Sequence, residues 1–115
     1  MTLNYYRDTC HEASKEAGWW NVADASGAIL GTKIALIHSE VSEMLEGLRK
    51  GLPDSHLPHR SAEEVEAADA LIRLFDYAGA RNLDLEGAFL EKMSYNKERL
   101  DHKKEARDAN GGKKF

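Results

Sequence analysis

The sequence predicts an all-α protein, a four-helix bundle, and three observations lead to that fold class. Apolar residues recur at steps of three and four over long segments, which is the period of an α-helix. Residues that start and stop helices stand at the ends of these segments. The two prolines, Pro53 and Pro58, are confined to the stretch GLPDSHLPHRS, and no segment shows the alternation of a convincing strand.

The first two helices follow from apolar periodicity. The stretch from Leu3 to Ala17 carries apolar residues at helical spacing, and GWWN ends it. A second and longer stripe consists of Leu30, Ile34, Ile37, Val41, Met44 and Leu48. Gly51 is placed to stop this helix, because glycine adopts the left-handed conformation of a helix end. The proline-containing loop follows.

The last two helices have clear start signals. Ser61 with Glu64 three residues later forms a capping box, and the helix after it carries its own apolar stripe from Val65 to Gly79. Asp84 caps the final helix, whose apolar face begins at Leu85. We expect one domain over residues 1–103 and a basic, flexible tail over residues 104–115.

Composition limits the kind of protein that this chain can form. Its 115 residues suffice for one domain, and 42% hydrophobic with 31% charged residues is typical of a globular protein. No apolar run reaches the roughly 20 residues that span a bilayer, and the N-terminal MTLNYYRDTC lacks the apolar centre of a signal peptide. With Cys10 as the one cysteine, no internal disulfide can form, so we expect a cytoplasmic protein without a membrane partner.

The charge is negative overall but unevenly placed. A net charge of −4 argues against nucleic-acid binding, which usually needs a basic face. Acidic residues dominate from Glu40 to Asp69, whereas the C-terminal end is basic. An enzyme that handles a metal-bound polyphosphate needs the same division, although solvated surface explains it as well.

Two pairs of carboxylates flank the apolar stripes of consecutive predicted helices. Glu40 and Glu43 lie on one flank of the second helix, whereas Glu46 falls near the opposite side as ordinary surface. Glu66 and Asp69 share one face of the third helix. Antiparallel packing through the loop would bring the four flanking carboxylates together. Such a set suits Mg²⁺ or Mn²⁺ rather than zinc, and the alternative is two unrelated exposed pairs.

Aromatic residues near the end of the first helix suggest a surface or a cleft. Trp19 and Trp20 are adjacent, so they cannot both face the same core. A stacking platform for a nucleobase is one interpretation. Core filling and a subunit contact are equally open at this point.

The acidic motifs resemble those of a known family. SEVSEMLEG followed by EEVEAADALIRLFD is similar to the MazG-like all-α nucleoside triphosphate pyrophosphohydrolases, which carry ExxE on one helix and ExxD on the next. The matching residues here are Glu40, Glu43, Glu66 and Asp69. The resemblance implies a MazG-like bundle assembled as a homodimer or homotetramer.

Two further motifs extend the resemblance. KMSYNKER is similar to the family's Lys, Asn and Arg element, carried by Lys92, Asn96 and Arg99. His11 with Trp20 is similar to the base-pocket pair of the dCTP pyrophosphatase branch, in a looser match. These five residues are the substrate-binding candidates that the resemblance implies.

The chain also departs from that branch. Arg73 follows Asp69 by one turn, where the dCTP branch carries an aromatic residue, so the base preference does not carry over. We expect Arg73 to link Asp69 with Asp76 behind the metal ligands.

The resemblance implies an enzyme that hydrolyses a (d)NTP between its α- and β-phosphates, giving a monophosphate and pyrophosphate, in nucleotide pool control or house-cleaning. The four carboxylates would hold Mg²⁺, with Mn²⁺ as a substitute, and Glu40 or Glu43 would take the proton of the attacking water. Lys92 and Arg99 would stabilise phosphoryl charge, and Asn96 would orient a phosphate or sugar hydroxyl.

Three other functions remain open. A phosphoribosyl-ATP pyrophosphatase would use the same chemistry on another substrate. A non-catalytic helical interaction module would keep the acidic pairs as a scaffold. A di-iron carboxylate bundle ranks below both, because its Glu-x-x-His pairs are absent from these helices.

Overall fold

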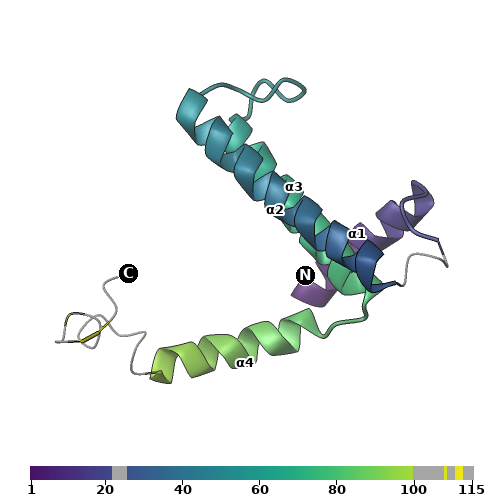
Figure 1. Cartoon of the computed structure of the whole chain (residues 1–115), viewed down its shortest axis with the longest axis vertical. Coiled ribbons are helices and arrows are strands. Elements are labelled where there is room, and N and C mark those ends of the chain that lie inside the picture. The colour runs from purple at the N-terminus through teal and green to yellow at the C-terminus, as the bar shows by residue number, and fades with distance from the viewer. Residues whose placement is uncertain (22–25, 100–107, 109–110, 113–115) are drawn as a thin grey trace. The chain divides into compact units, whose positions relative to one another are not determined.

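The computed structural model describes residues 1–21, 26–99, 108 and 111–112, and the chain is all-α over these residues (Figure 1). Its four helices are α1 (Leu3–Glu16), α2 (Gly27–Lys50), α3 (Ala62–Ala80) and α4 (Leu85–Glu98). The described ranges contain no strand, only an isolated bridge between Pro53 and Ser61. The predicted all-α class and the number of helices are confirmed over these residues. The predicted tail lies largely outside the described residues.

The helix ends are set by the side chains that the sequence places there. Gly51 ends α2 in the left-handed conformation with a φ of 63°, which costs glycine no steric clash. Ser61 and Glu64 form the capping box of α3, each accepting a hydrogen bond from the other's backbone N–H. The Asp84 side chain caps α4. All three predicted boundaries are confirmed.

A buried carboxylate organises the loop between α2 and α3. Asp54 is 8% exposed, and its Oδ2 accepts hydrogen bonds from the backbone N–H groups of His56 at 2.9 Å and Leu57 at 2.8 Å. The Asp54 N–H donates to the Arg60 carbonyl at 2.9 Å. The loop therefore supplies its own hydrogen-bond partners, and it returns the chain so that α3 runs antiparallel to α2 (Figure 1).

The chain divides into two units, Met1–Leu83 and Asp84–Phe115, and each is described by itself. In the first unit, α3 packs against both α2 and α1. The Tyr6 ring of α1 stacks on the Phe75 ring of α3 with centroids 5.8 Å apart. The second unit contains α4. None of the helices in the described ranges is long and apolar enough to cross a membrane.

Gly79 allows α1 to approach α3 closely. A Cβ at this position would lie 2.5 Å from the His11 Cβ and 2.9 Å from the Arg7 carbonyl oxygen, both on α1. At Gly31 on α2, by contrast, an added Cβ would meet no atom within 4 Å.

Gly79→Ala is therefore expected to destabilise the protein by about 1–3 kcal/mol, because α1 must move or the packing must strain. Gly31→Ala is the matched control, and we expect it to stabilise α2 by up to about 1 kcal/mol through helix propensity alone. Urea unfolding followed by circular dichroism measures both changes. Equal stabilisation by the two alanines would contradict the close contact.

The long apolar stripe of α2 is only half covered. Leu30, Ile37 and Met44 are half-buried. The other three residues of the stripe are exposed, with Ile34 at 41%, Val41 at 47% and Leu48 at 60%. Among the described residues no large side chain is fully buried, and the buried hydrophobic residue is Ala78. The predicted apolar stripe of α2 is therefore buried only in part within the first unit.

Candidate metal centre and adjoining cavity

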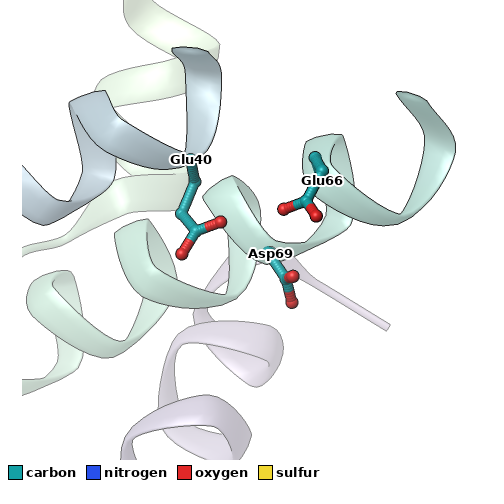
Figure 2. Close-up of side chains that lie close together, drawn as sticks. All are labelled: Glu40, Glu66 and Asp69. Atoms are coloured by element: carbon teal, nitrogen blue, oxygen red, sulfur yellow. The ribbon is translucent and has the colours of Figure 1, made fainter. Parts of the chain in front are cut away.

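Three of the four predicted carboxylates converge where α2 crosses α3. Glu40 of α2 lies with Glu66 and Asp69 of α3, and one oxygen from each lies within 4.8 Å of the others (Figure 2). Glu66 and Asp69 are three residues apart and so share one face of α3, which the antiparallel turn brings toward Glu40. All three are partly buried. Glu43 is exposed and lies outside this group, which we call the acidic cluster.

Crowding changes the acidity of Glu66. Its pKa is raised from 4.5 to about 7, first because partial burial strips water from the carboxylate. A hydrogen bond shared with Glu40 and the negative charges of Asp69, Glu40 and Glu43 raise it further. Glu43 therefore acts electrostatically on the acidic cluster without belonging to it.

Arg73 has a different observed partner from the one predicted. Its Nε donates to Glu40 Oε1 at 2.9 Å, so it bridges α3 to α2. Only 16% of the Glu40 side chain is exposed, against 44% of the Arg73 side chain. The guanidinium compensates part of the negative charge at one edge of the acidic cluster.

A cavity of about 660 Å³ adjoins the acidic cluster and shares Glu40 and Asp69 with it. This volume is in the usual range of small-molecule sites, about 300–1,000 Å³. Arg73 also lines the cavity, and part of its apolar and aromatic lining comes from Leu36, Ile72, Tyr77 and Trp20. Charged groups and flat apolar surface therefore meet in one cavity of the first unit.

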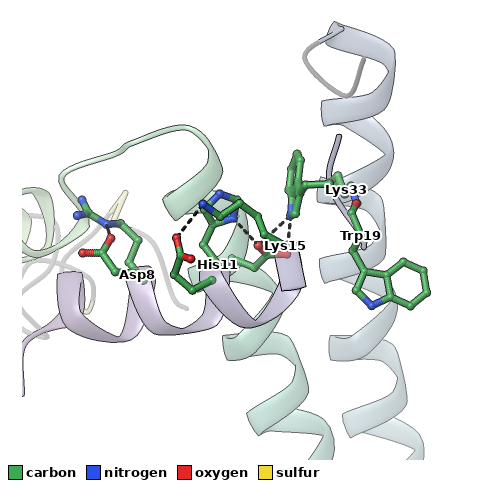
Figure 3. A network of polar contacts seen from close by, with 9 residues as sticks. Asp8, His11, Lys15, Trp19 and Lys33 are labelled. Carbon is green, nitrogen blue, oxygen red and sulfur yellow. Dashed lines mark hydrogen bonds and ion pairs between the residues drawn. The ribbon is translucent and has the colours of Figure 1, made fainter. Parts of the chain in front are cut away.

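A hydrogen-bonded network joins three predicted residues at the cavity (Figure 3). The Asp76 carboxylate is 2.9 Å from His11 Nδ1 and accepts the Trp20 indole N–H at 2.9 and 3.0 Å. Trp20 and Asp76 line the cavity, whereas His11 is not among its lining residues. Trp19 is 69% exposed and its ring points away from the network. The prediction that at least one tryptophan lies at a surface or cleft is confirmed.

Lys33 lines the cavity, although it was not among the site residues predicted from the sequence. Its Nζ lies 4.4 Å from the Trp20 ring centroid and donates to the Trp19 carbonyl oxygen at 3.0 Å. Lys33 precedes Glu40 by seven residues, which places the two on one face of α2 two turns apart. This seven-residue spacing in the sequence could have predicted a lysine on the same face of α2 as Glu40.

The predicted phosphate-binding residues lie on α4 or directly after it, in the second unit. Lys92 and Arg99 approach the Tyr95 ring, at 4.6 and 5.8 Å from its centroid, and Asn96 is half-buried. Their part in the site stays a prediction. Glu46 ion-pairs with its neighbours Arg49 and Lys50 on α2, as its predicted surface position implies.

Comparison with known proteins gives no match, either to a family model, to a curated protein or to a solved structure. The function of the chain is therefore inferred from the chemistry of the acidic cluster and the cavity beside it.

Proposed function

We propose that the protein is a Mg²⁺-dependent nucleoside triphosphate pyrophosphohydrolase, which converts a (d)NTP and water into a (d)NMP and pyrophosphate. The observation that carries the proposal is the acidic cluster at the edge of a cavity with aromatic lining. A cation-binding group and a flat apolar wall in one cavity suit a ligand with an anionic end and an aromatic end. The ExxE and ExxD motifs add support through their resemblance to the MazG-like family.

The donor set fits a hard divalent cation. Glu40, Glu66 and Asp69 offer carboxylate oxygens close enough to share one ion, and Mg²⁺ and Mn²⁺ prefer such ligands. The pKa of Glu66 is raised first by burial and then by its acidic neighbours, and a cation there would offset the repulsion from those neighbours. Bound Mg²⁺ would supply charge neutralisation for the triphosphate and a bound water of lowered pKa.

The proposal assigns the general base, the phosphate contacts and the base-binding surface to separate side chains. Arg73 engages Glu40, whereas Glu43 is exposed beside the acidic cluster, so we assign the general-base role to Glu43. The assignment of Lys92, Asn96 and Arg99 to the phosphates rests on the resemblance alone. Trp20 and Tyr77 offer flat surface for the base.

We also propose assembly with a second copy of the chain, as a homodimer or homotetramer. The row formed by Ile34, Val41 and Leu48 repeats every seven residues and is exposed along α2. A seven-residue apolar row can pair with its own copy about a two-fold axis. Burying these side chains would supply apolar burial that the first unit lacks by itself.

The first experiment is pyrophosphate release from a panel of standard and modified NTPs and dNTPs, with and without Mg²⁺. We expect a monophosphate and pyrophosphate as products, only when the metal is present, and a ranking of bases across the panel. Release of inorganic phosphate instead would indicate that a bond other than the one between the α- and β-phosphates is cleaved. Turnover of phosphoribosyl-ATP alone would select the first alternative function, and absence of any turnover by folded protein would favour the non-catalytic interaction module.

A further inference from the structure

Asp76 holds two aromatic side chains at once. Its Oδ1 lies 2.9 Å from both His11 Nδ1 and Trp20 Nε1, and its Oδ2 lies 3.0 Å from Trp20 Nε1 (Figure 3). Only 16% of the Asp76 side chain is exposed, so water competes weakly for these hydrogen bonds. The indole N–H is therefore directed at a fixed acceptor rather than at solvent.

His11 supports this carboxylate from the other side. Its ring and the Trp20 ring form an edge-to-face pair, with a centroid distance of 5.7 Å and an interplanar angle of 76°. The His11 Cβ lies so close to Gly79 that no side-chain atom fits between α1 and α3 there. The imidazole contacts Asp76 and Trp20, although it does not itself line the cavity.

Trp20 is the member of this network that presents a ring to the cavity. The Lys33 Nζ lies 4.4 Å from the centroid of that ring, a cation–π contact with its electron-rich face. The neighbouring Trp19 is held through its backbone carbonyl and leaves its ring exposed. Both tryptophans line the cavity, but Trp20 is the one whose indole N–H donates to Asp76.

We propose that Asp76 and His11 are positioning residues that fix the Trp20 indole as an aromatic wall of the cavity, against which a nucleobase stacks. The orientation of Trp20 stands on the contacts above, while the identity of the ligand rests on the proposed function. Asp76 thereby acts on binding through Trp20 and takes no part in the hydrolysis step. Its loss should weaken base binding and leave the acidic cluster intact.

The two tryptophans allow a direct spectroscopic test. Trp19→Phe leaves Trp20 as the single tryptophan of the chain, and this variant serves as the reference for all others. Adding Asp76→Asn offers Trp20 an amide in place of the two-oxygen acceptor. We expect red-shifted emission and a larger acrylamide quenching constant, measured without nucleotide. Asp8→Asn is the matched control, because its exposed carboxylate pairs with Arg7 and should leave the Trp20 signal unchanged.

The kinetic readout separates positioning from a merely structural effect. Since stacking on an aromatic side chain is worth about 1–3 kcal/mol per base, Asp76→Asn should raise the KM for the preferred nucleotide about fivefold or more. The kcat should stay within about twofold of the reference, because the acidic cluster is unaltered. Changed fluorescence with an unchanged KM would overturn the proposal. A fall in kcat of about fivefold with an unchanged KM would overturn it as well.

Variants of His11 keep the proposal testable if Asp76→Asn does not fold. Asn can place an N–H near the position of Nδ1, so His11→Asn should preserve the Trp20 signal, whereas His11→Leu should shift it as Asp76→Asn does. Identical spectra for these two variants would overturn the role of His11. If the reference protein turns over no nucleotide, the proposed function fails, and the fluorescence series alone decides whether Asp76 orients Trp20.

Discussion

Glu66→Gln is expected to reduce Mg²⁺-dependent turnover about a hundredfold or more. Glutamine keeps the shape of the side chain but removes one of the three charges that converge at the acidic cluster. Changing even the outer partners of metal ligands typically costs about 10- to 100-fold in affinity or activity, so a direct ligand should cost at least as much. Initial rates of pyrophosphate release across a Mg²⁺ titration measure the effect.

Glu46→Gln is the matched control for this substitution. Glu46 is a partly exposed glutamate on α2 that pairs with Arg49 and Lys50, so its neutralisation should leave turnover unchanged. Glu43→Gln tests the assigned general base and should lower kcat while metal binding persists. Undiminished activity in Glu66→Gln would remove Glu66 from the metal centre, and with it the proposed metal-binding role of the acidic cluster.

The same residue should make stability depend on pH. The pKa of Glu66 is about 7 in the folded protein against a usual 4.5, so between these values the folded state binds more proton than the unfolded chain. Stability without metal should therefore fall as pH rises through that window, and the loss should be complete above about pH 8. Glu66→Gln should lack this pH-dependent loss of stability. The melting temperature of the variant minus that of the wild type should therefore increase from about pH 5 to about pH 8.

Added Mg²⁺ provides the complementary measurement. At about pH 8 Glu66 is ionised, and the metal should raise the melting temperature of the wild type more than that of Glu66→Gln. At about pH 5 protons compete for the carboxylate, so the stabilisation should shrink. Parallel pH curves for wild type and variant would contradict the raised pKa of Glu66.

The helices could be predicted because their signals are local. Gly51, the Ser61–Glu64 capping box and Asp84 act within a few residues of themselves, so the sequence contains the whole interaction. The convergence of Glu40 with Glu66 and Asp69 was also predictable, since it needs only two helical faces and an antiparallel turn.

The remaining site contacts depend on how helices pack. Asp76 meets His11 because α1 lies against α3, and no periodicity in the sequence specifies that approach. Arg73 was expected along its own helix but pairs across to Glu40, because a long side chain can reach either neighbour. Glu43 is only three residues from Glu40, yet the small rotation between them leaves it outside the acidic cluster.

The half-covered stripe of α2 shows the same limit. Apolar period identifies which face of a helix avoids water, but not what covers each part of that face. Here Leu30, Ile37 and Met44 are half-buried, whereas the parallel row of Ile34, Val41 and Leu48 remains exposed. A partner for that row is the simplest physical reason for it, since exposed apolar rows of this length favour association.

Leu48→Glu is therefore expected to dissociate the proposed homo-oligomer. Leu48 is 60% exposed and ends the apolar row, four residues beyond Met44 and away from the acidic cluster. In an assembly about a two-fold axis the substitution occurs twice, so each interface must bury or repel two new charges. Loss of an apolar anchor at an interface costs about 2 kcal/mol or more, which corresponds to a rise of about thirtyfold or more in the dissociation constant.

Sedimentation velocity across a range of protein concentrations measures this change, with circular dichroism to show that helix content is kept. Ser42→Glu adds the same charge at an exposed polar position of α2 and should leave the assembly intact. A wild type that stays monomeric at every concentration would contradict the proposed assembly. If Leu48→Glu is monomeric but retains turnover, then each chain carries a complete site. If dissociation also removes turnover while Mg²⁺ binding persists, the second copy contributes to the substrate pocket rather than to the metal ligands.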